Sequence, residues 1–297
     1  MGIVLGIDIG SSATKIVAMD ESKTILNSLK VSASDPVTAM YGAVGKILCE
    51  ERMQIADVEA VMLTGMGASY VEGDVYGLPT TKVTEFDALG TGGLYLTGLE
   101  ETVVGSIGTG TVFVHAGPDG IQHIGGSAVG GGTLVGLSSR LFGIRDVEVI
   151  ADMAEQGNLK NVDWGIAELS RDQMETLPDY ATSSNLGKMK STATDEDVAM
   201  GLMNMIFQTA GTLAVFACRN VNLKKAVIGG STATLNQARI MLGQVGELYD
   251  PFLYGGSKYV ISTIYDSAAS NDVFPLRFIR PYSTFPFGFT VSNESIV

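Results

Sequence analysis

Short apolar runs that end in glycine organise the first part of the chain. Residues 3–10 (IVLGIDIG) form such a run, and residues 14–20 (TKIVAMD) follow with alternating apolar and polar positions, so the pair predicts a β-hairpin. Residues 58–65 (VEAVMLTG) predict a buried strand that also ends in glycine. A helix is predicted over residues 36–53, because Asp35 suits its N-cap and proline suits its first turn.

The same order of signals restarts near residue 101. Residues 101–117 (ETVVGSIGTGTVFVHAG) contain two β-rich runs around a glycine turn, which repeats the opening hairpin. Residues 82–96 pass from a strand edge into a helix just before this restart. The repetition predicts a duplicated α/β unit, with an N-terminal lobe over residues 1–100, a C-terminal lobe over residues 101–297 and a cleft between them.

Helical patterns dominate the second half of the chain. Residues 195–220 predict a long helix with acidic residues at its start and basic residues past its end, which suits the helix dipole. Residues 224–243 predict a strand, a glycine pair and a helix. The apolar run at 200–218 is long enough to cross a membrane, but Asn204 and Gln208 interrupt it, so a buried helix is expected.

Composition narrows the class of partner. The chain has 297 residues, 45% of them hydrophobic, which is enough to bury the cores of two lobes. A formal net charge of −13 argues against nucleic acid or an anionic membrane as a partner, so an anionic small ligand must be held by local donors. The only cysteines, Cys49 and Cys218, predict two free thiols in a reducing cytoplasm, and no cage of Cys and His for a metal. The first ten residues lack a basic region and are typical of a strand rather than a signal peptide.

Three glycine turns carry the candidate chemistry. A turn rich in Gly, Ser and Thr between strands points backbone N–H groups and hydroxyls into one concavity, which suits a polyphosphate. GIDIGSSATK supplies one such turn, with Asp8 before it as a candidate Mg²⁺ ligand and Lys15 after it. SIGTGT at 106–111 supplies a second, so that two lobes can grip one polyphosphate. VIGGST at 227–232 is a third, suited to close approach of a flat base and ribose.

Together these turns resemble the phosphate and adenosine motifs of the actin, hexokinase and Hsp70 ATPase superfamily, whose lobes have the ribonuclease H-like fold. More narrowly, the chain resembles the type II pantothenate kinases. The segments that carry this resemblance occur in family order: DIGSSATK (8–15), LTGMGA (63–68), VTEFDALGTGGLYL (83–96), SIGTGT (106–111), IGGSAVGGGTLVGL (124–137), DMAEQGN (152–158), SSNLGK (183–188) and VIGGS (227–231). The resemblance implies ATP and Mg²⁺ as cofactors, pantothenate as the acceptor, acyl-CoA as a feedback ligand and a homodimer.

The resemblance also implies residue roles. Glu85 matches the family's catalytic base, which takes the proton from the primary hydroxyl of pantothenate; the alternative is an exposed acid that only stabilises its helix N-terminus. Nucleotide contacts are expected from Asp8, Gly10, Ser11, Ser12, Thr14 and Lys15 in the first turn, from Gly108, Thr109 and Gly110 in the second, from Gly131, Gly132 and Thr133 in the glycine-rich stretch, and from Gly230 and Ser231 in the third turn. Thr111 and His123 are expected on the substrate side.

Two positions and one segment depart from the family pattern. His123 stands where the family usually has arginine, and Val112 where it commonly has serine, so two polar contacts to the acceptor are weakened. The segment at 273–297 has no counterpart to the family's closing small-residue helix. Three functions therefore stay open: a small-molecule kinase with pantothenate as the leading acceptor, a nucleotide- or acyl-CoA-binding regulatory homologue, and an ATPase that couples hydrolysis to a partner, as reductase activators of this superfamily do.

Overall fold

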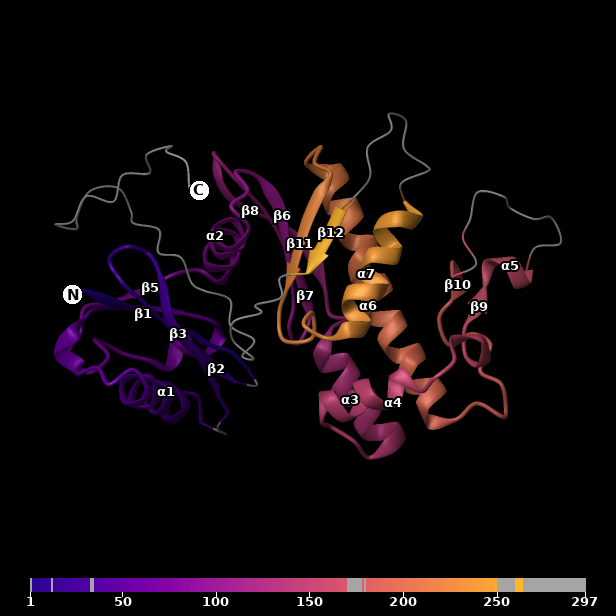
Figure 1. Ribbon diagram of the computed structural model, residues 1–297, viewed down its shortest axis with the longest axis horizontal. Coiled ribbons are helices and arrows are strands. Elements are labelled where there is room, and N and C mark those ends of the chain that lie inside the picture. The colour runs from indigo at the N-terminus through magenta and orange to yellow at the C-terminus, as the bar shows by residue number, and fades with distance from the viewer. Residues whose placement is uncertain are drawn as a thin grey trace.

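The computed structural model describes residues 2–11, 13–32, 35–169, 178, 180–249 and the strand at 260–263. The predicted phosphate contact Ser12 and the atypical segment at 273–297 lie outside the described residues. The described chain forms two mixed β-sheets that lie side by side, each with helices packed on it (Figure 1).

The N-terminal sheet has the strand order β3-β2-β1-β4-β5. Its strands are β1 (Ile3–Ile9), β2 (Thr14–Met19), β3 (Ile25–Val31), β4 (Val58–Thr64) and β5 (Thr80–Lys82). The predicted hairpin is confirmed, because β1 pairs antiparallel with β2, and β4 lies parallel to β1 on the other side. The sequence pattern did not predict β3, an edge strand with polar residues.

The C-terminal sheet repeats this topology. Its strands are β6 (Thr102–Ile107), β7 (Thr111–Gly117), β8 (Gly120–Ser127), β11 (Lys225–Gly229) and β12 (Val260–Thr263), in the order β12-β11-β6-β7-β8. The pairs β6/β7 and β7/β8 are antiparallel and the pairs β6/β11 and β11/β12 are parallel, as in the first sheet. The predicted duplication is therefore confirmed at the level of strand order and direction.

Helices cover the sheets and fill the space beyond the second one. They are α1 (Pro36–Glu50), α2 (Glu85–Thr97), α3 (Gly131–Phe142), α4 (Val147–Glu155), α5 (Ile166–Leu169), α6 (Asp195–Asn220) and α7 (Asn236–Leu248). Short 3₁₀ turns lie at Ile55–Asp57, Met66–Tyr70 and Leu159–Asn161, and β9 (Trp164–Gly165) pairs with β10 (Thr182–Ser184). Asp35 caps α1 as predicted, but that helix ends three residues before the predicted position, and Arg52 takes a left-handed φ of 55°.

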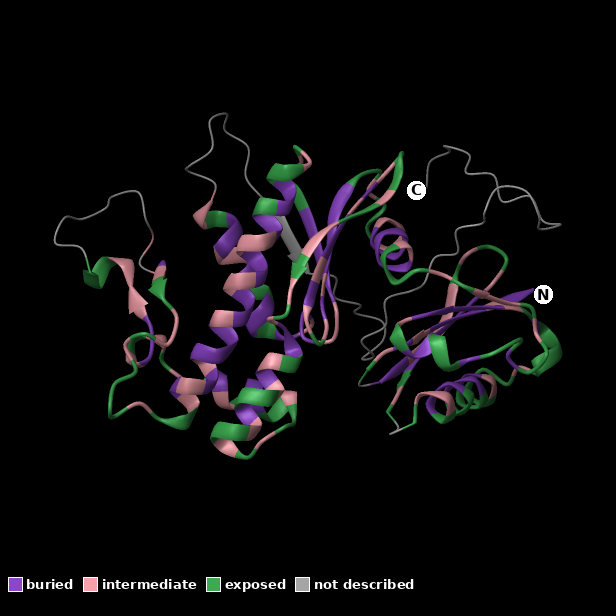
Figure 2. Ribbon diagram, turned by 180° about the vertical axis from the view of Figure 1, so that it is seen from behind, coloured by how far each residue is buried: buried purple, intermediate pink, exposed green. Residues whose placement is uncertain are grey.

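Helix α6 lies at the centre of the larger core. Its buried residues include Leu202, Met203, Ile206 and Phe207, and they pack with α4, α7 and the second sheet. Among the described residues it is the one helix long and apolar enough to span a membrane. Figure 2 shows the buried stripe along it, so the predicted buried helix is confirmed.

Helix α2 packs on the second sheet although it precedes that sheet in the chain. Leu89 of α2 lies in an apolar cluster with Val104 of β6 and Val114 of β7. Two glycines permit this approach: a Cβ on Gly93 would lie 2.6 Å from a methyl carbon of Val104, and one on Gly90 would meet Ile121 of β8. The helix that begins with Glu85 is thus fixed to the C-terminal sheet, and the predicted lobe boundary near residue 100 stays a prediction.

Candidate functional site

The first glycine turn joins β1 to β2 and carries an ion pair. The Gly10 N–H donates to the Ala13 carbonyl over 3.1 Å, which closes the turn. Asp8 and Lys15 are register partners across the hairpin, and Lys15 Nζ donates to Asp8 Oδ2 over 3.0 Å. Both side chains keep about a quarter of their surface exposed, at 26% for Asp8 and 23% for Lys15. The pair is therefore ordered and still open to a ligand.

Gly65 of the LTGMGA segment lies directly against Asp8. Its φ of +85° is in the left-handed region, and a Cβ at this position would lie 2.4 Å from Asp8 Oδ1. Any other residue would be strained and would displace the carboxylate. This segment thus supports the first turn from the end of β4, a role that the sequence pattern alone did not assign.

The second glycine turn lies between β6 and β7 and is held by the N-terminus of α3. The Gly131 N–H donates to the Gly108 carbonyl over 2.7 Å, and the Gly132 N–H donates to the Thr109 carbonyl over 2.9 Å. A Cβ on Gly130 would lie 2.7 Å from the Gly110 backbone. The turn and the glycine-rich stretch, which are separate motifs in the sequence, form one backbone cradle.

The two phosphate-type turns meet through their side chains. Ser11 Oγ and Thr109 Oγ1 lie 2.8 Å apart in a hydrogen bond between residues 98 positions apart in the sequence. Both hydroxyls are exposed, so they are available to an anionic ligand. This contact places the first turn of one sheet opposite the second turn of the other, as the sequence analysis expects for two turns that grip one polyphosphate.

The third glycine turn, after β11, packs on the second. Gly230 has a φ of +100°, and a Cβ there would lie 2.4 Å from the Ile107 carbonyl oxygen, which explains its glycine. Thr232 Oγ1 donates to the same carbonyl over 3.0 Å, and its methyl carbon lies against Gly131. Sequence reasoning missed Thr232, although it directly follows the predicted contact Ser231.

Glu85 is the first residue of α2, and its carboxyl is influenced by the charges of the first turn. Burial raises the pKa of Glu85, the negative charge of Asp8 raises it further, and Lys15 lowers it. The residue still exposes much of its surface, so it is crowded on one side and accessible on the other. The charged groups of the first turn thus act on the carboxyl of Glu85, and its role as the base stays a prediction.

The substrate-side residues have different surroundings. The ring of His123 stacks on Phe86, the residue after Glu85, with centroids 4.3 Å apart and planes 8° from parallel. His123 is exposed and stacks on the residue next to the candidate base, and its place on the substrate side stays a prediction. Val112 packs against the apolar cluster beneath α2. The apolar side chain at this position, where the family commonly has serine, therefore contributes to packing.

Three threonines predicted to contact a ligand are hydrogen-bonded or buried inside the protein. Thr111 is buried and donates to the Val129 carbonyl over 2.8 Å, and Thr14 is 1% exposed. Thr133 Oγ1 accepts from the Gly130 N–H over 3.2 Å. Their predicted ligand contacts stay predictions, and their observed bonds shape the turns.

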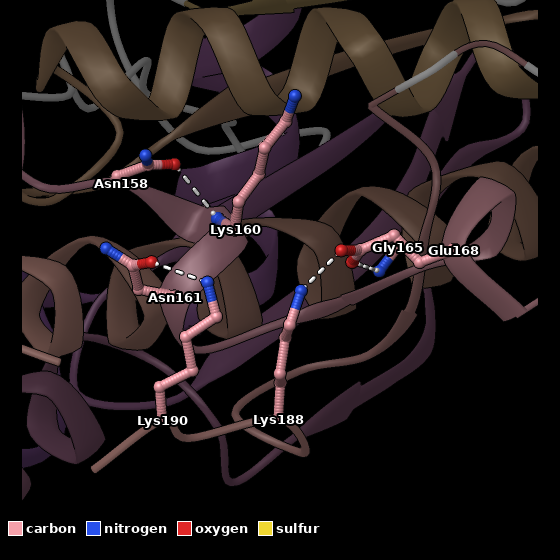
Figure 3. Close-up of polar contacts among 7 residues, drawn as sticks. All are labelled: Asn158, Lys160, Asn161, Gly165, Glu168, Lys188 and Lys190. Atoms are coloured by element: carbon pink, nitrogen blue, oxygen red, sulfur yellow. Dashed lines mark hydrogen bonds and ion pairs between the residues drawn. The ribbon is translucent and has the colours of Figure 1, made fainter. Parts of the chain in front are cut away.

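Two of the family-like segments lie away from these turns. DMAEQGN and SSNLGK contribute Asn158 and Lys188 to a polar cluster near β9 and β10, two strands at the end of the molecule farthest from the first sheet (Figure 1). In it Lys190 Nζ donates to Asn161 Oδ1 over 2.9 Å and Lys188 pairs with Glu168, as Figure 3 shows. Lys188 also lies 5.0 Å from the centre of the Trp164 ring. The cluster holds this extension together and adds no group to the glycine turns.

The residues present fit Mg²⁺ better than a metal that needs a protein cage. Within the described part of the chain, no group of three or more His, Cys, Asp or Glu side chains could enclose a metal ion. Mg²⁺ keeps several waters and binds through one or two carboxylates together with substrate phosphates. Asp8 is such a carboxylate, and its side chain is 26% exposed.

Solved structures identify the class of fold. The protein has a TM-score of 0.61 to component A of (R)-2-hydroxyglutaryl-CoA dehydratase from Acidaminococcus fermentans, at 16% identity, covering 89% of this chain and 92% of that one. It has a TM-score of 0.62 to the ADPNP-bound activator of 2-hydroxyisocaproyl-CoA dehydratase from Clostridium difficile, at 15% identity and 88% coverage of each chain. A ROK hexokinase from Thermus thermophilus gives 0.52 at 14% identity, covering 90% and 94%. The protein is an α/β protein of the actin-like ATPase fold.

Sequence comparison supports the resemblance to a family. The Fumble family model matches residues 102–242. The chain is 24% identical over 254 residues to a type II pantothenate kinase of Staphylococcus epidermidis, covering 82% of this chain and 90% of the relative. It is 23% identical over 237 residues to that of Staphylococcus aureus strain USA300, covering 77% and 84%. The resemblance to the type II pantothenate kinases is therefore confirmed, and it supports a kinase of this fold.

Proposed function

We propose that the protein is an ATP- and Mg²⁺-dependent kinase that phosphorylates the primary hydroxyl of pantothenate or of a closely related small alcohol. One observation carries the proposal: the two phosphate-type turns meet at Ser11 and Thr109, whose hydroxyl oxygens lie 2.8 Å apart. The charges of Asp8 and Lys15 in the first of these turns also act on the carboxyl of Glu85, whose pKa burial raises. A general base and a phosphate-binding turn at the same site are what transfer of a phosphoryl group to an alcohol requires.

Each group has a role in this reaction. Glu85 accepts the proton of the acceptor hydroxyl as that oxygen attacks the γ-phosphate, and a carboxylate of raised pKa holds that proton better. Lys15 and the exposed hydroxyls of Ser11 and Thr109 offset the charge of the phosphates. Asp8 holds Mg²⁺, which neutralises charge on the phosphates when bound.

The nucleotide is assigned to the cradle made by the second and third turns. At three glycines of this cradle, a Cβ would collide with the neighbouring backbone or with a threonine methyl: Gly131, Gly132 and Gly230. Because glycine has no Cβ, the three segments pack closely. Ser231 directly follows Gly230 in the third turn and is assigned to the adenosine side. The name of the ADPNP-bound neighbour agrees with a nucleotide at such a site.

Pantothenate is the leading acceptor because the relatives named above are pantothenate kinases. The Phe86–His123 stack next to Glu85 is where the acceptor would lie. Histidine is shorter than arginine and lacks its fork of donors, so this site binds a carboxylate less strongly than an arginine site would.

The activator-type ATPase is less well supported, despite the similar fold. Such activators carry cluster-ligand cysteines near a dimer seam. Here Cys218 is buried, which raises its thiol pKa to about 12, and Cys49 is exposed on the separate helix α1. A thiol with so high a pKa is a poor metal ligand at neutral pH. Homodimer formation, an acyl-CoA feedback ligand and a cytoplasmic location remain part of the proposal and follow from the family resemblance.

The decisive experiment measures ADP release with MgATP, with and without pantothenate, together with mass spectrometry of the acceptor. A kinase releases ADP only with an acceptor and yields the phosphorylated acceptor. ADP release that is independent of pantothenate would favour the partner-coupled ATPase. MgATP binding without any turnover, on pantothenate or on a panel of small alcohols, would favour the regulatory homologue and refute the proposal.

A further inference from the structure

Two side-chain hydroxyls in the described part of the chain are buried without a hydrogen-bond partner: Thr64 Oγ1 and Ser138 Oγ. Thr64 is 2% exposed and Ser138 is fully buried. A buried hydroxyl without a partner costs stability, and native proteins rarely keep one unless water or a ligand completes it. The positions of the two residues show which of them faces a ligand site.

Thr64 is the last residue of β4 and lies in line with the ion pair of the first turn. In the sheet register Thr64 pairs with Asp8, and Asp8 pairs with Lys15. Residues paired across neighbouring strands project to the same face of a sheet. Thr64 therefore shares a face with Asp8 and Lys15. The flanking residues Leu63 and Ile9 project to the opposite face, where α1 packs.

The Asp8 carboxylate is turned toward both neighbours in this row. Its Oδ2 accepts from Lys15 Nζ on the β2 side. Its Oδ1 lies on the β4 side, 2.4 Å from where a Cβ of Gly65 would be, and Gly65 directly follows Thr64. Thr64 is therefore the register partner of Asp8 on the strand that borders this carboxylate oxygen.

Ser138 has no such neighbour. It lies within α3, seven residues after Gly131, and faces the interior. It provides a matched case: a buried hydroxyl without a partner that is not in register with the Asp8 row.

We propose that Thr64 is a further positioning residue of this site, whose hydroxyl bonds an oxygen of the hydrated divalent cation that Asp8 holds together with a nucleotide. The inference rests on the proposed function. Mg²⁺ keeps most of its waters in such sites, and each of those waters needs an acceptor. Thr64 Oγ1 supplies an acceptor at the edge of the Asp8 carboxylate. A solely structural threonine would instead contribute through its methyl group and shape.

The test compares Thr64→Val, which keeps the shape and removes the hydroxyl, with Thr64→Ser, which keeps the hydroxyl. Ser138→Ala is the control for removal of a buried hydroxyl elsewhere. Each protein is titrated calorimetrically with ADP and with a non-hydrolysable ATP analogue, once with Mg²⁺ and once with EDTA. Urea unfolding of the ligand-free proteins measures stability separately.

We expect Thr64→Val to be at least as stable as wild type without ligand, because an unpaired hydroxyl is removed. Its Mg²⁺-dependent gain in nucleotide affinity should fall by about threefold to tenfold, the usual effect of one hydrogen bond, while binding in EDTA stays unchanged. Thr64→Ser should retain most of the gain, and Ser138→Ala should bind as wild type does.

The other outcomes each overturn the inference. Wild-type Mg²⁺ dependence in Thr64→Val would show that the hydroxyl contacts no part of the cation complex. Equal losses with Mg²⁺ and with EDTA would assign it to the nucleotide instead. A ligand-free Thr64→Val that is less stable or does not fold would make the hydroxyl structural. If wild type itself shows no Mg²⁺-dependent nucleotide binding, the proposed function fails together with the inference; failure in Thr64→Val alone leaves the function standing.

Discussion

Glu85→Gln is the substitution that tests the proposed chemistry most directly. The amide has nearly the shape of the carboxylate, and Thr84 rather than Glu85 caps α2 by accepting from the Asp87 N–H, so the helix should be unaffected. The amide is unable to accept the acceptor's proton. It also removes a negative charge that Asp8 disfavours, so nucleotide binding should be unchanged or slightly tighter.

The expected loss follows from the role of the base. Removing a positioned general base costs about 10² to 10⁴ in turnover. At 1.36 kcal/mol per factor of ten, that range corresponds to about 2.7 to 5.4 kcal/mol of transition-state stabilisation. Because Glu85 is partly exposed, its effect on folding should stay within about 0.5 kcal/mol.

The sign of the pH dependence is fixed by the raised pKa. The base acts when ionised, so kcat/KM should fall as pH drops through a pKa above the usual value for glutamate. The same shift means that ionising Glu85 costs folding stability as pH rises through that pKa. Glu85→Gln should therefore be as stable as wild type at acid pH and slightly more stable at neutral pH.

The assay is steady-state ADP release with the acceptor, across pH 4.5 to about 8, paired with calorimetric nucleotide binding. Asp87→Asn is the matched control, because Asp87 is an acid in the same helical turn whose carboxylate is bonded to the Thr84 hydroxyl. It should keep near-normal turnover. A Glu85→Gln protein that turns over at the wild-type rate, or that retains the acid limb of the pH profile, would remove Glu85 from the role of base.

Three further substitutions test the metal, the turns and the acceptor. Asp8→Ala should abolish the Mg²⁺-dependent rise in melting temperature with nucleotide, and an unchanged rise would reject Asp8 as the Mg²⁺ residue. Gly230→Ala should destabilise the protein by about 2 kcal/mol or more in urea unfolding, because of its φ of +100° and its contact with β6, whereas Gly136→Ala, which has open space around it, should not. The double substitution His123→Arg with Val112→Ser should raise pantothenate affinity by about one to two decades in calorimetry, because a charged hydrogen bond contributes roughly 1.5 to 3 kcal/mol. Tight pantothenate binding by the wild-type protein would instead show that other donors hold the acceptor.

Much of the fold follows from local sequence patterns. The opening hairpin, its repeat after residue 101 and the buried helix α6 were predicted because strand alternation, glycine turns and helix caps are read from neighbouring residues. The edge strand β3 was missed, since Asn27, Ser28 and Lys30 interrupt its apolar pattern. An edge strand is defined largely by backbone pairing with β2, which leaves a weak signal in its side chains.

The sequence by itself determined which residue types are available at the site: the glycine turns, Asp8, Lys15 and Glu85. Tertiary structure alone decided how they meet. Ser11 reaches Thr109 across 98 residues, and α2 carries Glu85 on the second sheet while Asp8 and Lys15 belong to the first. These contacts depend on how the two sheets pack on each other, and no local pattern encodes that packing, because the periodicity of a strand specifies only which of its faces is buried.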